Sequence, residues 1–243
     1  MHWPRRTPLV LLAAGVLCVC ISAAALTTSD PRWWLSCFSR LGAMQDGSSA
    51  LFNGGMMLAG AVIALSAWPV RRGLKAASAA GLPANGAVPV VVPLLIVGLG
   101  LSLALVGVLP LSFNVVAHER AANGALASSA GLLLMHRLHL RGLSRTLDRL
   151  SLGAIVVLVV GMTALIAGLI TLTVFEALTF GSVIAWLQTL QSRVEHLRPV
   201  ASRPFSANSQ HLTLSPIWGT RWSGVIVKIS AEDVDRDLGT RST

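Results

Sequence analysis

The chain has 243 residues, of which 53% are apolar and only 12% are charged. An average soluble domain is about 25% charged, so this chain has too little polar surface for a soluble enzyme of its size. Its formal net charge is +9, but the basic residues are spread between long uncharged windows, which is typical of membrane topology signals and not of a nucleic-acid-binding surface. Cys18, Cys20 and Cys37 form neither a disulfide framework nor a metal set, and no cofactor is expected.

Windows without ionised residues divide the chain into six predicted membrane-spanning helices. A bilayer core of about 30 Å requires about 20 helical residues, and the uncharged windows range from 16 to 43 residues. The two windows of 16, from Arg120 to Arg137 and from Glu176 to Arg193, are short, so polar residues at their ends must enter the membrane boundary. We expect an all-α membrane domain over 1–192, with spans near 7–28, 49–69, 88–109, 118–136, 152–172 and 175–192.

The charges of the loops predict the orientation of these helices. Basic segments at the N-terminus and in the second and fourth loops alternate with nearly neutral first, third and fifth loops. The positive-inside rule then places both termini in the cytoplasm, whereas five spans would leave the Arg-bearing tail outside. Because Arg residues far outnumber Lys and Ala and Gly are abundant, we expect a GC-rich bacterial genome and a plasma-membrane location.

Two alternatives concern individual spans. The first span, Leu9 to Leu26, follows an Arg pair and has the features of a cleaved signal peptide, although its length favours a retained anchor. The fifth and sixth spans join around Thr171 to Glu176 without a Pro or Gly turn, so one long bent helix is conceivable. Two spans explain the segment from Gly153 to Leu190 better, because a single helix of that length would be about twice the core thickness.

The segment over 193–243 has a different composition and is predicted to be a mostly disordered cytoplasmic tail. Pro199, Pro204 and Pro216 interrupt helical periodicity. Within the tail, Val225–Ile229 is the one stretch that favours a short strand, and the acidic run that follows is typical of a solvated end.

Polar residues are concentrated at the expected outer face. The second, fourth and sixth spans all begin there, each with a polar group, and the first loop lies just above them. We therefore predict an outer-face polar cluster of Ser39, Arg40, Asn53, His118, Glu119 and Glu176. Small residues continue along the faces that begin with His118 and Asn53, including Ala125 and Gly60 respectively, and such stripes indicate contact with neighbouring helices.

The residues of the outer-face polar cluster have two interpretations: they bind a ligand, or they only hold the helices together. A carboxylate at a helix N-terminus is favoured by the helix dipole alone, and Asn53 would serve equally well as an interhelical hydrogen bond. His136 and His139, at the other end of the fourth span, have no nearby carboxylate or Cys in this interpretation and do not form a metal pair. Sequence motifs for phosphate loops, zinc proteases and serine hydrolases are absent.

The segments Ser36–Gly42 and Ser49–Gly55 resemble the first-loop and second-span signature of a bacterial family of six-helix membrane proteins related to the Frag/DRAM/Sfk proteins. The family's later motifs are matched by His118 with Ala122 and by Glu176 with Trp186, and the resemblance covers about residues 7–192.

This chain departs from the family pattern at two places: Asn114 stands where relatives often carry an acidic residue, and Ala177 follows Glu176 in place of Arg. The resemblance implies no established reaction. For eukaryotic relatives it implies membrane lipid organisation, lysosomal or autophagy regulation, and lipid-anchor remodelling.

We expect a non-catalytic plasma-membrane protein that organises lipids or a membrane partner through the outer-face polar cluster, and that binds no nucleic acid. The alternative is a membrane enzyme acting on a lipid or lipid-linked head group at the outer leaflet, with His118 as acid or base and Glu176 as its partner. That alternative requires His118, Glu176 and Asn53 to converge. A small-solute transporter is the third hypothesis, but it needs polar residues near the midplane, where only a few Ser and Thr occur.

Overall fold

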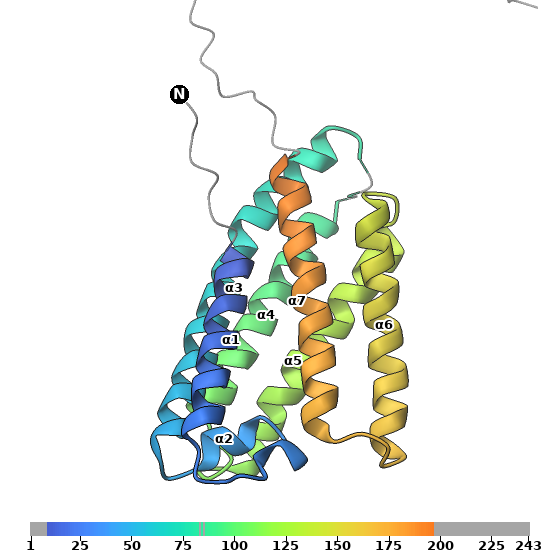
Figure 1. The fold of residues 1–243 in the computed structure, drawn as a ribbon. Coiled ribbons are helices and arrows are strands. Elements are labelled where there is room, and N and C mark those ends of the chain that lie inside the picture. Colours follow the sequence, from blue (N-terminus) through green and yellow to red (C-terminus); the bar gives the residue numbers. More distant parts are fainter. Residues whose placement is uncertain (1–8, 83, 85, 197–243) are drawn as a thin grey trace, which may run out of the picture. The chain divides into compact units, whose positions relative to one another are not determined.

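The computed structural model describes residues 9–82, 84 and 86–196, and this part of the chain is entirely helical (Figure 1). The α-helices are α1 (Leu9–Thr27), α2 (Ser39–Ala43), α3 (Gly47–Ala79), α4 (Val88–Val108), α5 (Val115–Met135), α6 (Arg145–Ile166) and α7 (Leu172–His196). A 3-10 turn, η1 (Trp33–Leu35), precedes α2, and a π-helical turn, η2 (His136–Leu140), continues α5. The predicted all-α fold is therefore confirmed for the described residues.

Five of the described helices, α1, α3, α4, α6 and α7, are long and apolar enough to cross a membrane, by length and composition. These helices indicate a membrane protein. α5 has 21 residues, the same length as α4, but it does not reach the same hydropathy. Its first half carries His118, Glu119, Arg120 and Asn123, and these polar side chains account for the difference.

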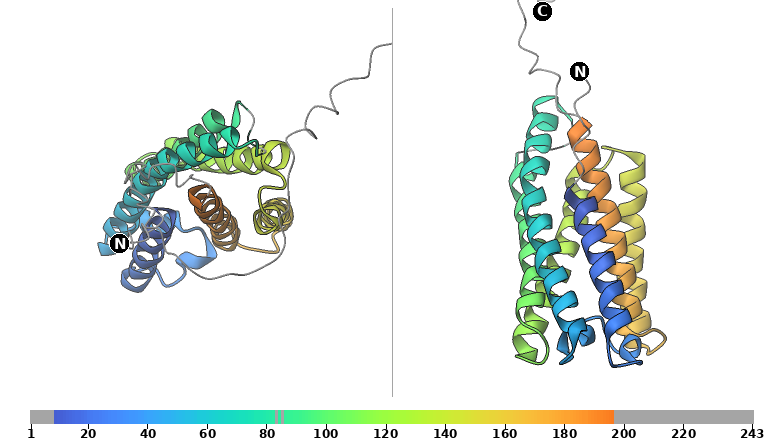
Figure 2. Two further views of the ribbon diagram at one scale, coloured as in Figure 1. Left: turned by 90° about the horizontal axis from the view of Figure 1, so that it is seen from above. Right: turned by 60° about the vertical axis from the view of Figure 1, so that its left-hand side comes forward.

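The six long helices run side by side and alternate in direction (Figure 1). α3 packs between α1 and α4, α5 packs on α4, and α7 contacts both α6 and α3. Seen along the helix axes, α3, α4 and α5 form a curved row with α7 on its concave side (Figure 2). The first turn of α1 and the last turns of α7 meet at the same end of the bundle, where the Val10 N–H donates to Gln191 Oε1 over 3.2 Å.

α3 and α4 approach each other closely because glycines face each other across their contact. A Cβ on Gly60 would lie 2.5 Å from the carbonyl oxygen of Gly100, and a Cβ on Gly100 would lie 2.5 Å from the carbonyl oxygen of Gly60. Small residues permit such backbone contact between helices in lipid. The contact predicted for the Gly60 face is confirmed here.

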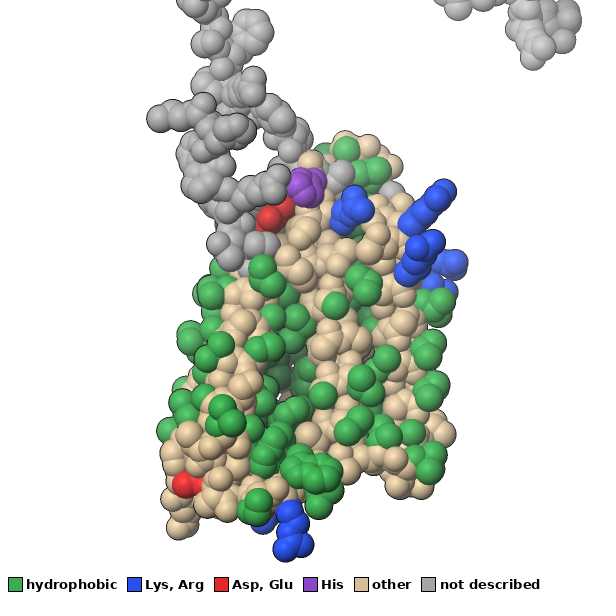
Figure 3. Space-filling model, viewed as in Figure 1, with side chains coloured by type: hydrophobic (Ala, Val, Ile, Leu, Met, Phe, Trp, Pro, Cys, Tyr) green, Lys and Arg blue, Asp and Glu red, His purple; other side chains and the backbone are tan. Residues whose placement is uncertain are grey.

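The two ends of the bundle differ in charge. One end carries most of the described Lys and Arg residues, and we call it the basic end (Figure 3). Its basic residues are Arg71, Arg72, Lys75, Arg137, Arg141, Arg145, Arg149 and Arg193. The opposite end, which we call the loop end, carries Arg32, Arg40 and Arg120 and is formed by η1, α2 and the turns between α4 and α5 and between α6 and α7. The loops that are basic in the sequence therefore lie at one end of the bundle, and the nearly neutral loops lie at the other.

Several helix boundaries differ from the predicted ones. α3 continues through Pro69 to Ala79, α6 begins at Arg145, and α7 ends at His196, so residues 193–196 are helical and do not belong to the tail. The rest of the tail, with its predicted strand, lies outside the described residues.

α6 and α7 are two separate helices, and a glycine turn joins them. Gly168 has a φ of +70°. Its N–H donates to Leu165 O over 3.0 Å, and the Leu169 N–H donates to Ala164 O over 2.9 Å, which is the Schellman arrangement that ends many helices. The expectation of a join over 171–176 without a Gly turn is therefore wrong, because the chain turns a few residues earlier, at Gly168.

Candidate functional site

The segment over residues 38–42 lies across the loop end and is held by polar side chains from three different helices. We call it the anchored segment. Glu176, in the second turn of α7, accepts a hydrogen bond from the Phe38 backbone N–H through Oε2 at 2.8 Å. Sequence reasoning placed Glu176 at the start of a helix facing the boundary, but the turn at Gly168 moves the helix start back to Leu172. Glu176 therefore faces the anchored segment from within α7.

His118 binds the same segment from α5, and both of its ring nitrogens have partners. Nδ1 lies 2.7 Å from the carbonyl oxygen of Leu109, at the end of α4. A carbonyl can only accept, so Nδ1 carries the proton and donates. Nε2 lies 2.9 Å from Ser39 Oγ, and in the neutral imidazole Nε2 accepts the Ser39 hydroxyl proton. The ring is buried, with 4% of its surface exposed.

The third anchor comes from α3. Asn53 donates through Nδ2 to the Gly42 carbonyl over 3.0 Å. The hydroxyl oxygen of buried Ser48 lies 3.1 Å from the Leu41 carbonyl, which shares the one hydroxyl proton with Asp46. Together with Glu176 and His118, these contacts tie the anchored segment to α3, α5 and α7. Their common effect is to fix the position of the anchored segment, because each of the three helices binds a different part of it.

Arg40 and Glu119 do not take part in this arrangement. Arg40 is exposed and pairs with Asp30 at 3.3 Å between Nε and Oδ2, and Glu119 is exposed on the outer side of α5. The pKa of the Asp30 carboxyl lies below its ordinary value, chiefly because the Arg32 backbone N–H donates to it, with a smaller contribution from Arg40. Four of the six predicted cluster residues therefore lie together, and two lie on the surface.

Asp46 also stabilises the loop end, through a role that the sequence analysis does not predict. It caps α3 by accepting from the Ser48 N–H at 2.9 Å and from the Ser48 hydroxyl. It also accepts from the Ser29 N–H and the Ser29 hydroxyl, each at 2.8 Å. These donors hold the pKa of Asp46 well below its ordinary value, with the Ser48 side chain as the largest cause. An Asp directly before a long helix is the sequence signal that identifies such a cap.

A cavity of about 400 Å³ opens between α1 and α7, with α3, α4 and α5 as its floor. Its lining is almost wholly apolar, but Ser39 and Glu176 lie in its wall at the loop end. Along α7 it extends from Glu176 to Ile184, a distance of about 12 Å at the rise of an α-helix. Figure 3 shows the hollow between the two helices, with hydrophobic side chains along it.

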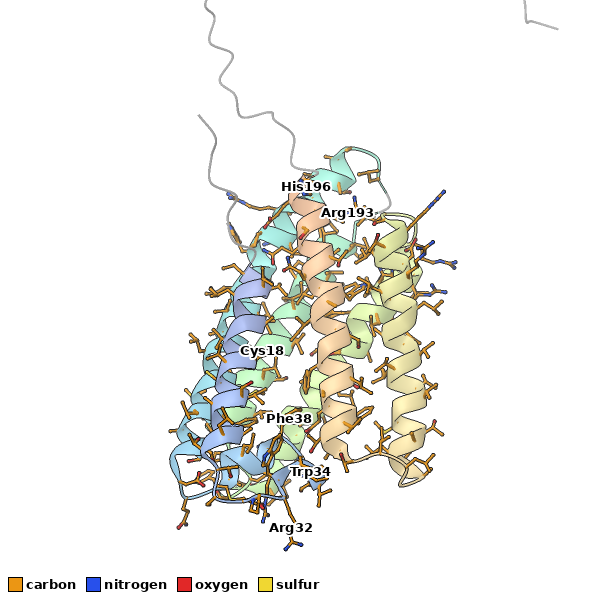
Figure 4. The ribbon with its side chains drawn as sticks, viewed as in Figure 1. Cys18, Arg32, Trp34, Phe38, Arg193 and His196 are labelled. Carbon is orange, nitrogen blue, oxygen red and sulfur yellow. The ribbon has the colours of Figure 1, made fainter. Side chains whose placement is uncertain are left out.

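The rim of this cavity faces sideways, toward the position of lipid. Cys18 of α1 and Gly181 of α7 line the cavity and are both exposed. Figure 4 shows Cys18 at the middle of the bundle and Phe38 below it at the loop end, both beside the gap between α1 and α7. A molecule that occupied the cavity would therefore have an apolar body within the bilayer and a polar end at the anchored segment.

At the basic end, His136 has a carboxylate partner that was not expected. Its Nε2 lies 3.0 Å from Asp148 Oδ1, across the turn between α5 and α6. The His136 ring is fully buried and packs edge-on against Trp186 of α7. Asp148 also accepts from the Gly142 N–H at 3.2 Å, so the contact closes this turn. Groups of three or more potential metal ligands are absent from the described part of the chain.

His118, Glu176 and Asn53 do not bind one another in the described structure, since each has a separate partner in or beside the anchored segment. The convergence that the enzyme hypothesis requires is thus not found, although Ser39 and His118 do form a pair. A scan of the chain against protein-family models found no match, and searches of curated proteins and of solved structures found none either.

Proposed function

We propose that this chain is a plasma-membrane protein with six spans and cytoplasmic termini, and that it organises outer-leaflet lipids without catalysis by binding a lipid in the cavity between α1 and α7. One observation carries the proposal: an apolar cavity, open toward the bilayer, has Glu176 and Ser39 in its wall at the loop end. Pockets of about 300–1,000 Å³ with few polar groups are typical of small-molecule sites.

The helix that raises the number of spans from five to six is α5, the fourth long helix in chain order. It lies beside α4 along the bundle and has the same length. Its polar residues fall in its first half, at the loop end, where a short polar start would meet the head-group region. With six spans the first turn of α1 and the end of α7 share one side, and the basic residues of that end favour the cytoplasm.

The chemistry of the cavity favours a lipid whose head group donates hydrogen bonds. Oε2 of Glu176 is used by the Phe38 N–H, whereas Oε1 has no hydrogen-bond partner among the described residues. A hydroxyl or ammonium group of a lipid head would supply a donor to Oε1. The acyl chain would then lie along the apolar face between Phe180 and Ile184 of α7 and Leu17 of α1.

The test is lipid retention by the full chain purified from nanodiscs, measured by mass spectrometry. Gly181 lines the cavity, so Gly181→Trp places a large side chain in the cavity mouth. The substitution is sterically possible because a Cβ at Gly181 has nothing within 4 Å. Retained lipid should fall about tenfold, which corresponds to about 1.4 kcal/mol of binding free energy. Leu178→Trp, on the exposed side of the same helix, is the matched control and should leave retention unchanged. Equal retention in both variants and the wild type would contradict the proposal.

A second candidate function, acyl transfer or hydrolysis at the same head-group position, is favoured by the Ser39–His118 pair. A hydroxyl hydrogen-bonded to an imidazole, which is itself oriented by a third group, is the arrangement of an activated nucleophile. Here the Leu109 carbonyl is the orienting group.

A fluorophosphonate probe distinguishes this candidate from simple binding. Covalent labelling of Ser39 that is lost in His118→Gln and kept in Ser22→Ala, another cavity-lining serine, would support an enzyme. The non-catalytic proposal expects no labelling of Ser39.

A further inference from the structure

A second groove lies on the opposite side of α3, between α3 and α4 and toward the basic end. It has a volume of about 380 Å³ and is bounded by Leu65, Trp68 and Arg71 of α3 and by Val90, Leu94 and Val97 of α4. None of its lining residues belongs to the cavity between α1 and α7. It is a separate site, and what it binds does not depend on the proposed function.

The groove is apolar along its length and cationic at one end. Arg71 forms part of its wall. The guanidinium of Arg72 lies 5.1 Å from the ring centroid of Trp68, which is a cation–π contact. Lys75 follows one turn later on α3. Trp68 is exposed, as expected of an aromatic ring at the boundary of the membrane.

These positive charges have no acidic partner in the described structure. The sequence contains no Asp or Glu between Asp46 and Glu119, so neither α3 nor α4 supplies one. The ion pairs found among the described residues involve Arg40 and His136 and none of the three basic residues of α3. Glu195 of α7 lies at the same end but accepts a hydrogen bond from Gln191, and it forms no ion pair with Arg71, Arg72 or Lys75 among the described residues.

We propose that this groove binds an anionic phospholipid from the leaflet at the basic end, with one acyl chain against Leu94 and Val97 and the phosphate at Arg71 and Arg72. Basic pockets between membrane-spanning helices bind anionic head groups, and each Lys or Arg near the surface adds to the attraction. Arg suits a phosphate because its planar fork can donate two parallel hydrogen bonds. A zwitterionic lipid would fill the apolar part equally well but would leave the Arg charges uncompensated.

The experiment compares the lipids retained by the full chain after extraction from nanodiscs that contain equal amounts of phosphatidylglycerol and phosphatidylcholine. Native mass spectrometry gives the ratio of the two lipids still bound. In the wild type phosphatidylglycerol should be enriched about fivefold to thirtyfold, the range for one or two basic side chains near a phosphate. The double substitution Arg71→Gln and Arg72→Gln should bring the ratio close to one.

The matched control is the double substitution Arg145→Gln and Arg149→Gln. It removes the same charge from exposed positions at the same end, but on α6 and away from the groove. It should keep the enrichment. An equal loss in both double variants would mean that the whole basic end attracts anionic lipid without a site, and absence of enrichment in the wild type would also overturn the proposal.

A second pair of variants tests the groove itself with all charges in place. Val90→Phe fills the groove, whereas Val108→Phe makes the same change at an exposed position of α4 that does not line the groove. Only the first should lower phosphatidylglycerol retention. Retention that is unchanged in Val90→Phe would contradict an acyl chain in the groove even if the Arg variants behave as expected.

Discussion

His118 links two segments that are distant in the sequence, because one ring nitrogen binds the end of α4 and the other binds Ser39. Replacing it with Ala would leave the Leu109 carbonyl and the Ser39 hydroxyl without partners. Each such loss costs about 1–3 kcal/mol when the group is buried, so we predict that His118→Ala lowers the unfolding free energy by at least this amount. Thermal unfolding in detergent measures the change.

Glu119→Ala is the control for this variant, because Glu119 is the next residue and is exposed. Its effect should stay within about 0.5 kcal/mol, as is usual for surface substitutions. Similar melting temperatures for the two variants would show that the ring contacts of His118 add little to stability.

The low pKa of Asp46 makes the free energy of unfolding depend on pH in the acid range. Its pKa in the folded protein lies well below the ordinary value of 3.8, so the unfolded chain takes up a proton first as the pH falls. The stabilisation from its ionised form is therefore complete above about pH 4 and is lost progressively below it. We predict that Asp46→Asn, which can still cap α3, makes unfolding less sensitive to pH in this range. Melting curves between about pH 5 and pH 2 test the prediction; parallel curves for the two proteins would contradict it.

At the scale of helices, the contact between α3 and α4 depends on Gly60. A Cβ at this position would meet the Gly100 carbonyl at 2.5 Å and the Ala104 nitrogen at 2.6 Å, and neither is a flexible group. We predict that Gly60→Ala destabilises the protein by about 1–3 kcal/mol, as overpacking generally does. Unfolding in detergent followed by circular dichroism measures this.

Gly54→Ala provides the comparison within the same helix. A Cβ at Gly54 meets nothing within 4 Å, so the substitution should be neutral or should stabilise α3 by about 0.5–1 kcal/mol through the higher helix propensity of Ala. Equal stability of Gly60→Ala and Gly54→Ala would contradict the prediction, because it would mean that α3 and α4 can move apart without a loss of free energy.

The helices could be predicted from the sequence, but their ends could not. Hydropathy windows report where the membrane ends, whereas a helix ends where its backbone hydrogen bonds end. α3 therefore continues through the basic residues 71–75 to Ala79, well past the predicted boundary. The turn at Gly168 was misplaced for the related reason that an apolar sequence on both sides of a glycine gives no change in hydropathy.

The residues of the candidate site were predictable by type, but their partners were not. Asn53, His118 and Glu176 were expected to lie near the first loop, because polar groups at the starts of alternate spans share one depth. All three bind backbone groups, those of Gly42, Leu109 and Phe38 respectively, and every residue carries such groups. Which N–H or carbonyl is within reach depends on how the chain folds, and the sequence pattern carries no signal for it.

For the whole molecule, the proposed topology makes a labelling prediction. In a chain whose three cysteines are replaced by Ser, a single Cys at Gln45 would lie at the loop end and one at Arg141 at the basic end, both exposed. An impermeant maleimide added outside intact bacterial cells should modify Gln45→Cys and leave Arg141→Cys unmodified until the membrane is opened. Reactivity of Arg141→Cys from outside would reverse the orientation.

The sideways opening of the cavity between α1 and α7 affects how it is loaded. A ligand that enters from the bilayer comes from a two-dimensional solution, so its occupancy follows its mole fraction among the membrane lipids and not its concentration in water. Diluting the membranes with buffer would leave the occupant in place, whereas adding an excess of a different lipid would displace it. The composition of the leaflet itself would then be the quantity to which this protein responds.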